Sequence, residues 1–293
     1  MEKTIKAYAK INLHLDVTGI REDGYHSVET VMQSLSLCDD VSVCLTDDGS
    51  LLATCNMADL PGDERNIAVR AARLYLDKIK SDKGAFIRIE KRIPVAAGLA
   101  GGSADAAATL IALNQLFDDR LTYDELISLG ASLGADVPFC IACGTHYSDG
   151  RGDVLHSFPT LDKNVVFVVA CGGEGVSTPW GYSLLDRTFD CFSSYTPKGC
   201  DKLRVAIAEG KIFDFTKHIF NIFEAPVTAE RPVAKKLLDA LRDNGALAVR
   251  MSGSGPSVFG VFDSVSSAQR ALAAISPIEC FACICYPIGA RNS

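Results

Sequence analysis

Residues 94–113, PVAAGLAGGSADAAATLIAL, decide the fold, because they join an extended segment to a helix through a turn with very small side chains. The glycines in this turn let backbone N–H groups approach a ligand closely. The helix that follows adds the positive end of its dipole, so the combination favours phosphate. We expect Ser103 to cap the helix through its hydroxyl, and residues 104–113, which have almost no polar face, to be buried.

The loop does not match the commoner phosphate-binding motifs. Its glycines are not followed by Lys-Ser or Lys-Thr, as in a P-loop, and no G-x-G-x-x-G opens a helix in this chain. A glycine- and alanine-rich turn that packs against a neighbouring helix without binding a ligand is therefore an alternative for the loop taken alone. The rest of the chain has to decide between the two.

Composition and charge narrow the classes of function. The chain has 293 residues, of which 48% are hydrophobic and 22% charged, enough for one large or two medium domains with a full core. The net charge of −7 argues against nucleic acid and anionic membranes as partners, so a phosphate site must be local. The opening MEKTIKAYAK does not resemble a signal peptide, and no apolar run is long enough to span a bilayer. We expect a cytoplasmic protein.

The 11 cysteines include two C-x-x-C pairs, Cys140 with Cys143 and Cys280 with Cys283, a spacing that can hold zinc. Both pairs lie in apolar runs that lack the turn residues of a zinc knuckle. Buried, reduced thiols are the favoured interpretation, and a zinc-stabilised scaffold is the alternative. We assign no metal ligand from the sequence.

Four polar side chains stand in places that indicate a site. Lys10 interrupts the apolar strand predicted over residues 5–18, where a lysine that snorkels from an edge strand is the alternative. Asp136 lies in the apolar corner LGADVPF, and a buried carboxylate needs a partner, for which Lys10 is the candidate. Tyr25 and His26 end a turn side by side, where they can either bind a planar ligand or simply pack.

The order of predicted elements mixes α and β structure. The patterns predict strands in the first half around amphipathic helices at 66–80 and 122–133, the second of which starts with a capping box. Proline and charge interrupt the apolar pattern at 158–164, which divides the chain into domains 1–158 and 159–293. The second domain alternates short strands and helices around another glycine-rich turn, MSGSGPS, and this indicates a small sheet with helices on one face.

Three motifs, in this order, resemble the kinase superfamily named for galactokinase, homoserine kinase, mevalonate kinase and phosphomevalonate kinase. They are AYAKINLHLDVTGIREDGYH at 7–26, PVAAGLAGGSADAAATLIALN at 94–114 and MSGSGPSVFGVF at 251–262, and they span nearly the whole chain. The R-x-D-G-Y-H turn, together with LGADVPFC and EKRIP, looks like the 4-diphosphocytidyl-2-C-methyl-D-erythritol kinase family within that superfamily.

The resemblance implies a fold and an activity. The implied fold is a two-domain α+β kinase, with an N-terminal domain like ribosomal protein S5, a ferredoxin-like C-terminal domain and the ligands in the cleft between them. The implied reaction is ATP-dependent phosphorylation of the 2-hydroxyl of a cytidine diphosphate substrate, a step of the non-mevalonate route to isoprenoid precursors. Magnesium is implied with ATP. Another small-alcohol kinase of the superfamily and a non-catalytic ligand-binding relative are the alternatives, and the oligomeric state is not indicated.

The resemblance also implies roles for individual residues. Lys10 and Asp136 match the catalytic pair, with Asp136 as general base and Lys10 holding it ionised. Tyr25 and His26 match the positions that hold cytosine, and Tyr182 is the second aromatic for stacking. The phosphate loop of the family matches residues 94–104, and Gly253 and Gly255 of the third motif match the glycines that support it. The residues expected at ATP are Asn66, Lys91, Pro94, Val95, Ala96, Ala97, Gly98, Leu99, Ala100, Gly101, Gly102, Ser103 and Ala104.

The phosphate loop departs from the family pattern. Many members have glycine where this chain has Ala96, Ala97 and Ala100, and a second serine where it has Ala104. Alanine rarely adopts positive φ, so we expect the left-handed residues of the loop to be confined to its glycines. Asp105 follows directly and would repel phosphate unless a cation or solvent lies between them.

Overall fold

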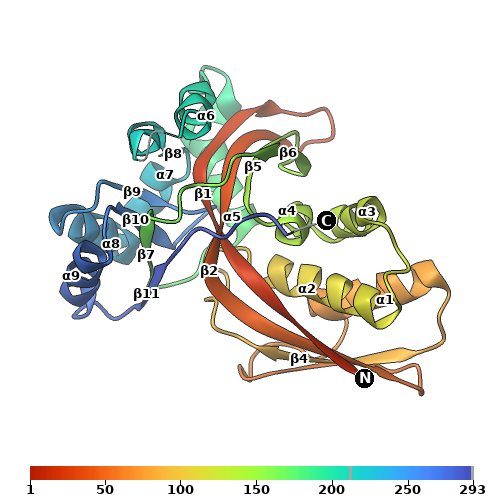
Figure 1. Ribbon diagram of the computed structural model, residues 1–293. Helices are drawn as coiled ribbons and strands as arrows, with labels where there is room; N and C mark the ends of the chain where they lie inside the picture. Colours follow the sequence, from red (N-terminus) through yellow and green to blue (C-terminus); the bar gives the residue numbers. More distant parts are fainter. Residues whose placement is uncertain (211–212, 292–293) are drawn as a thin grey trace.

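Two β-sheets, each packed against its own helices, organise residues 1–210 and 213–291, which the computed structural model describes (Figure 1). The strands of the first sheet follow the order β3-β4-β2-β1-β8, and β5 pairs with β2 and with β6. These strands are β1 (Glu2–Ile20), β2 (His26–Thr46), β3 (Leu51–Cys55), β4 (Gly84–Glu90), β5 (Thr145–Asp149), β6 (Val154–Phe158) and β8 (Phe220–Asn221).

Four helices pack together beside the first sheet. They are α1 (Ile67–Ile79), α2 (Gly101–Leu116), α3 (Tyr123–Leu133) and α4 (Val137–Ala142). The expected capping box of α3 is present, because Thr122 accepts a hydrogen bond from the backbone N–H of Glu125, whose side chain in turn accepts one from the N–H of Thr122. The last turn of α1 ends at Lys80, which adopts the left-handed conformation common at helix ends.

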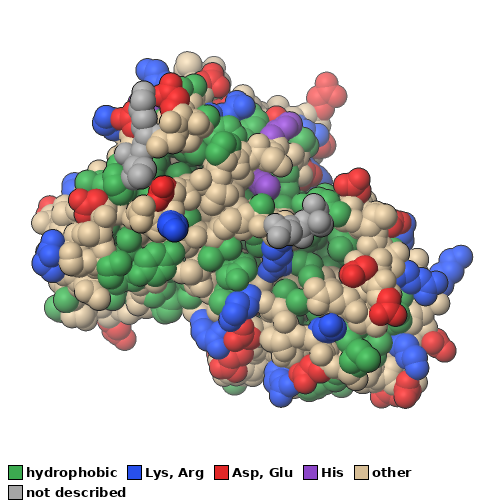
Figure 2. All heavy atoms as spheres, viewed as in Figure 1, with side chains coloured by type: hydrophobic (Ala, Val, Ile, Leu, Met, Phe, Trp, Pro, Cys, Tyr) green, Lys and Arg blue, Asp and Glu red, His purple; other side chains and the backbone are tan. Residues whose placement is uncertain are grey.

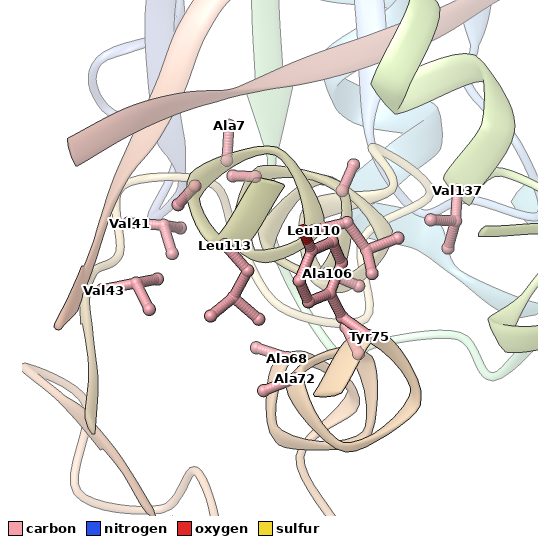
Figure 3. Close-up of a cluster of buried hydrophobic side chains, with 14 of the residues drawn as sticks. Ala7, Val41, Val43, Ala68, Ala72, Tyr75, Ala106, Leu110, Leu113 and Val137 are labelled. Atoms are coloured by element: carbon pink, nitrogen blue, oxygen red, sulfur yellow. The ribbon is translucent and has the colours of Figure 1, made fainter. Parts of the chain in front are cut away.

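Helix α2 lies in the middle of this core, as its composition predicts. Figure 3 shows Leu113 of α2 between the strand residue Val43 and the side chains of Ala68 and Ala72 on the neighbouring helix α1. Small alanine side chains let helix and strands approach closely, so almost every residue from 104 to 114 is buried. The dense packing fixes the start of α2, and with it the phosphate loop.

The second sheet has the order β11-β7-β10-β9, and all of its neighbouring strands are antiparallel. Its strands are β7 (Val166–Cys171), β9 (Ala248–Met251), β10 (Val258–Phe262) and β11 (Phe281–Cys285). Helices α8 (Pro232–Asp243) and α9 (Val265–Ile275) pack against it. Between β7 and α8 the chain forms α5 (Thr178–Thr188), η1 (Asp190–Phe192), α6 (Asp201–Ala208), η2 (Asp214–His218), the strand β8 of the first sheet and α7 (Glu224–Glu230).

The two halves are joined at several points. The boundary predicted after residue 158 falls between β6 and β7, which belong to different sheets, and the exact division stays a prediction. Strand β8 from the second half pairs in parallel with β1 of the first sheet. The end of the described chain returns to the first half near α4 (Figure 1), where Ala290 forms a bridge to Cys143. Residues of the first half are therefore held in place by the second.

The surface carries charges of both signs. On the face in Figure 2, acidic and basic side chains are interspersed, which agrees with the small net charge for a chain of this length. Of the helices that the structure describes, none is both long and apolar enough to cross a membrane.

Candidate active site

A cleft of about 590 Å³ lies between the two halves and collects most of the predicted residues. Lys10 and Asp136 line it together with the phosphate loop, and Tyr182 and Gly253 line it from the second half. Asn66 and Lys91 lie along the same cleft. Tyr25 and His26 stand beside it, in contact with residues that line it.

The phosphate loop has an unexpected conformation. Positive φ occurs at Ala96 (52°) and Ala100 (57°) as well as at Gly98 (77°), so our expectation that only glycines would be left-handed was wrong. Gly101 and Gly102 have helical geometry inside α2. The two alanines are held by the surrounding structure, since the carbonyl of Ala96 accepts from the N–H of residue 176 and α2 begins directly after Ala100.

The start of α2 differs from the prediction in a second way. Its N-cap is Ala100, and no side chain caps it, so the cap expected from Ser103 was wrong because Ser103 already lies inside the first turn. The N–H groups of this turn therefore have no side-chain acceptor, and the turn lines the cleft. Uncapped N–H groups and the helix dipole together make a site for an anion.

The third glycine motif supports the phosphate loop from behind. The hydroxyl of Ser252 donates to the carbonyl of Gly98 at 2.9 Å, and the N–H of Ser257 donates to the carbonyl of Ala97 at 3.2 Å. A Cβ on Gly253 would lie 2.9 Å from the carbonyl oxygen of Gly98, so only glycine permits this approach. Gly255 is left-handed and close to Met251. This geometry agrees with the supporting role predicted for the motif.

Lys10 reaches the cleft through an irregularity in β1. The register between β1 and β2 shifts between Tyr8 and Lys10, and the N–H of Lys10 donates instead to the carbonyl of Leu99 in the phosphate loop, at 3.1 Å. Its ammonium donates to Oδ1 of Asn12 at 2.7 Å and lies 3.7 Å from Oδ2 of Asp136. The strand thus fixes both the backbone and the charge of Lys10 next to the loop.

Asp136 immediately precedes α4 but makes no capping hydrogen bond with its side chain. Its carboxylate is 37% exposed, more open than we expected for a residue in an apolar corner, whereas the side chain of Lys10 is 5% exposed. The expected contact with Lys10 is present, and Asp136 lines the cleft. A partly exposed carboxylate in a cleft is accessible to a hydroxyl group, and a general base requires this access.

Lys91 belongs to a buried charge cluster beneath the start of α2. Its ammonium lies 2.5 Å from Oδ2 of Asp39 and 2.8 Å from Oδ2 of Asp105. Burial disfavours the charge on Lys91, but the two carboxylates outweigh burial and raise its pKa. Burial, with the charge of Asp39, raises the pKa of Asp105 to about 7, although Lys91 opposes that shift. The ammonium that we expected at ATP is therefore already paired with two acids.

Asn66 has a structural task beside the cleft. Its Oδ1 accepts from the N–H of Ala68 at 3.0 Å and its Nδ2 donates to the carbonyl of Pro61, also at 3.0 Å, so it caps α1. Pro61 and Ile67 line the cleft with it. Contact between Asn66 and a nucleotide stays a prediction.

The three residues predicted to hold a base lie close together. The ring of His26 stacks on that of Tyr182 with centroids 4.6 Å apart and an angle of 28° between the planes. Nε2 of His26 lies 2.7 Å from Oδ1 of Asp186, a hydrogen bond that fixes the orientation of the ring. Tyr25 is 60% exposed, with the guanidinium of Arg151 5.5 Å from its ring centroid. The rim of the cleft is thus aromatic, and the exposed ring of Tyr25 is accessible to a planar ligand.

These features can be compared with known proteins. The profile described as "GHMP kinases N terminal domain" matches residues 66–144, and "GHMP kinases C terminal" matches 203–278. The 4-diphosphocytidyl-2-C-methyl-D-erythritol kinase of Clostridium acetobutylicum is 38% identical over 91% of this chain and 93% of its own. The kinase of the same name from Synechococcus sp. (strain JA-3-3Ab) is 41% identical over 92% of this chain and 87% of its own. This chain belongs to the 4-diphosphocytidyl-2-C-methyl-D-erythritol kinase family.

Solved structures agree with the family assignment. A crystal structure of 4-(cytidine 5'-diphospho)-2C-methyl-D-erythritol kinase superimposes with a TM-score of 0.78 and 32% identity, over 98% of this chain and 99% of the other. The homoserine kinase of Cytophaga hutchinsonii has a TM-score of 0.73 at 19% identity, over 99% and 96% of the chains, and shares the fold. The two-domain α+β kinase fold that we predicted is confirmed.

In this member of the kinase family, our sequence reasoning missed Asn12, which joins strand β1 to the third motif. Its Oδ1 accepts from Lys10 and from the N–H of Gly253 at 2.9 Å, and its Nδ2 donates to Thr30. The position of Asn12, two residues after Lys10 in a strand, was the available signal, because such residues share one face.

Asp16 was also missed, and it anchors a segment beside the aromatic rim. It is fully buried, accepts from the hydroxyl of Tyr195 at 2.6 Å and accepts from the N–H of Lys198 at 2.7 Å. Burial raises the pKa of Asp16, while these hydrogen bonds oppose that shift. Phe192, from the anchored segment, packs its ring edge-on against His26. Tyr195 and Lys198 lie about 180 residues after Asp16 in the chain, so no local sequence pattern predicts these contacts.

Proposed function

We propose that the chain transfers the γ-phosphoryl group of ATP to the 2-hydroxyl of 4-diphosphocytidyl-2-C-methyl-D-erythritol and releases ADP and the 2-phosphate. The observation that carries this proposal is the position of Lys10 and Asp136, 3.7 Å apart, in the same cleft as an uncapped helix start. Relatives about 40% identical over almost the whole chain bear the name of this activity. We also propose that the reaction serves isoprenoid precursor synthesis by the non-mevalonate route.

In this mechanism Asp136 accepts the proton of the substrate hydroxyl while that oxygen attacks the γ-phosphorus. Lys10 keeps the carboxylate ionised by its nearby positive charge and stabilises negative charge on the transferring group. Asn12 holds the ammonium in place by accepting one of its hydrogens. Phosphoryl transfer depends mainly on positioning and charge neutralisation, and these groups supply both.

The phosphate loop binds the β- and γ-phosphates of ATP through backbone N–H groups. The first turn of α2 contributes N–H donors without a side-chain cap, and the loop is fixed from three sides, by Lys10, Val176 and Ser252. A preorganised loop does not have to reorder when the transition state forms. The left-handed alanines belong to this fixed geometry.

The residues present also fit a magnesium ion bound together with ATP. Oδ1 of Asp105 is buried and has no hydrogen-bond partner among residues 1–210 and 213–291, although the side chain lines the cleft. Carboxylate and hydroxyl oxygens suit magnesium, so Asp105 and Ser103 are the residues that would hold it. When bound, the ion neutralises negative charge on the phosphates.

The proposal is tested with purified protein, ATP and magnesium by measuring ADP release. The acceptors to compare are 4-diphosphocytidyl-2-C-methyl-D-erythritol, homoserine and mevalonate, and phosphorus NMR identifies the position of the new phosphate. ADP release with the cytidine compound alone supports the proposal. ADP release with another alcohol assigns a different kinase activity. No ADP release with any of the three acceptors favours a non-catalytic relative.

A further inference from the structure

The order of the chemical groups in the proposed substrate indicates where its negative charges lie along the cleft. A cytosine base stands at one end, the alcohol that accepts the phosphate stands at the other, and a diphosphate joins them. The base belongs at the aromatic rim formed by Tyr25, His26 and Tyr182, and the hydroxyl belongs at Lys10 and Asp136. The diphosphate must therefore lie between these two places, where its negative charge needs a cation. This step rests on the proposed function.

Four cationic side chains line the cleft among the described residues: Lys10, Arg65, Lys91 and Arg151. Lys91 is buried between Asp39 and Asp105. Lys10 is nearly buried and serves the reacting hydroxyl. The remaining two are arginines at different parts of the cleft wall.

The two arginines differ in what surrounds them. Arg65 forms a two-pronged pair with Asp63 directly before α1, next to the cap residue Asn66. Arg151 stands at the aromatic rim, with its guanidinium 5.5 Å from the centroid of the Tyr25 ring. Arg151 is thus the arginine that lies next to the base-binding residues.

A hydrogen-bonded turn presents Arg151 to the cleft. It occupies the β5–β6 connection between Gly150 (φ 67°) and Gly152 (φ 91°), which closes through a hydrogen bond from the N–H of Gly152 to the carbonyl of Asp149. The carbonyl of Gly150 accepts from the N–H of Val28 at 2.8 Å and so joins the turn to the start of β2. The position of the arginine backbone is therefore set by two strands of the first sheet.

The guanidinium of Arg151 uses only part of its hydrogen-bonding capacity within the described residues. Its Nη2 donates to Asp153 at 3.3 Å, and no other hydrogen bond of its side chain is formed with the described residues. Asp23, on the Tyr25 turn, is the second acid near it. The pKa of Asp23 is lowered mainly by the hydrogen bond from the N–H of Tyr25, with smaller contributions from Arg21 and Arg151. With five N–H donors in a planar fork, the side chain can keep Asp153 and still offer a pair of N–H groups to phosphate oxygens.

We propose that Arg151 binds the diphosphate of the cytidine substrate. Its side chain is 44% exposed in the absence of ligand, so a phosphate can reach it without displacing a buried partner. One face of the Tyr25 ring contacts the guanidinium, which leaves the other face for the base. Arg151 thereby selects nucleoside diphosphates over neutral nucleosides, and takes no part in transfer from ATP.

The test compares the binding of cytidine 5'-diphosphate and of cytidine by titration calorimetry. The variants are Arg151→Met and Arg151→Lys, and Arg88→Met is the matched control, because Arg88 is an exposed arginine of β4 paired with Glu2 outside the cleft. We expect Arg151→Met to reduce the preference for the diphosphate roughly tenfold, the value of one charge-assisted contact. Arg151→Lys keeps part of the preference and Arg88→Met keeps all of it.

Kinetics provide an independent readout. With the full substrate, Arg151→Met raises KM for the cytidine compound by about the same factor and leaves kcat and the KM for ATP unchanged. An unchanged preference for cytidine 5'-diphosphate in Arg151→Met overturns the proposal, and so does a wild-type protein that does not prefer the diphosphate. If wild-type protein does not phosphorylate the cytidine compound, the proposed function fails, and the binding ratio still decides the role of Arg151.

Discussion

The hydroxyl of Ser252, in the second half of the chain, donates a hydrogen bond to the carbonyl of Gly98 in the phosphate loop at 2.9 Å. The hydroxyl oxygen of Ser252 also accepts a hydrogen bond from the N–H of Asn12 at 3.3 Å, and Ser252 is completely buried. One side chain thus joins the third glycine motif, strand β1 and the phosphate loop. The position of the loop depends on this contact between the halves.

Replacing Ser252 by alanine leaves the buried carbonyl of Gly98 without this donor and loosens the loop. We expect KM for ATP to rise roughly fivefold, equivalent to about 1 kcal/mol, the usual contribution of one neutral hydrogen bond. Steady-state kinetics with ATP as the varied substrate measure the change. Ser257→Ala is the control, because the Ser257 side chain lies in the same turn and makes no hydrogen bond to the loop. Equal effects of both variants contradict the explanation.

Asp136→Asn tests the proposed general base. The amide keeps the shape of the side chain but cannot take up a proton, so turnover should fall by about two to four orders of magnitude. Binding of a fluorescent ATP analogue should stay close to the wild-type value, because Asp136 lies outside the phosphate loop. Turnover within a few-fold of wild type would remove Asp136 from the role of base.

Tyr25→Ala tests the base-binding end of the cleft. Loss of one stacking ring should weaken binding of the cytidine substrate by about 1 kcal/mol or more, while KM for ATP changes little. Tyr123→Ala is a matched control, because Tyr123 is also a partly exposed tyrosine but begins α3. A loss of similar size for both substrates in Tyr25→Ala would show that the ring supports the fold and does not contact the base.

Local patterns predicted the parts of the structure that depend on nearby residues. The alanine run gave the position of a buried α2, and Thr122 with Glu125 gave the start of α3, because periodicity and caps act within a few residues. The contact of Lys10 with Asp136 was predictable since each of two charges in apolar segments needs a partner. The kinase fold followed from three motifs whose order is preserved.

Features set by distant parts of the chain were not predictable in the same way. The left-handed Ala96 and Ala100 contradict local preference, and they persist because contacts with the second half and dense packing around α2 outweigh it. The pairing of Lys91 with Asp39 joins positions 52 residues apart, and neither sequence neighbourhood indicates the other. Asp16 shares this long-range character, whereas Asn12, two residues from Lys10 on one strand, could have been found from the local pattern.

Ala100→Gly should stabilise the protein, because it removes the steric cost of a Cβ at φ 57°. We expect a gain of about 1 kcal/mol in the free energy of unfolding, measured by urea denaturation. Ala104→Gly is the opposite control: Ala104 is buried inside α2, where glycine should cost about 1 kcal/mol. Destabilisation by Ala100→Gly would mean that the loop tolerates its alanine without strain.

His146 makes the stability of the fold depend on pH. It is buried on β5 with its ring edge-on to Phe139, and neither ring nitrogen has a hydrogen-bond partner among the described residues. Burial, assisted by the charge of His156, lowers the pKa of His146 from 6.5 to about 4. Below pH 6.5 the unfolded chain therefore binds a proton that the folded protein excludes until about pH 4, so stability falls as the pH drops through this window.

Between pH 7 and pH 5 this histidine should lower the free energy of unfolding by about 2 kcal/mol, since each pH unit below the unfolded pKa contributes roughly 1.4 kcal/mol. His146→Leu removes the proton-binding group. In urea titrations at the two pH values, the difference between the free energies of unfolding should therefore be smaller in this variant by about 2 kcal/mol. Part of the dependence remains, because burial also lowers the pKa of His14 to about 4. The same slope in wild type and His146→Leu would show that His146 does not resist protonation in the folded protein.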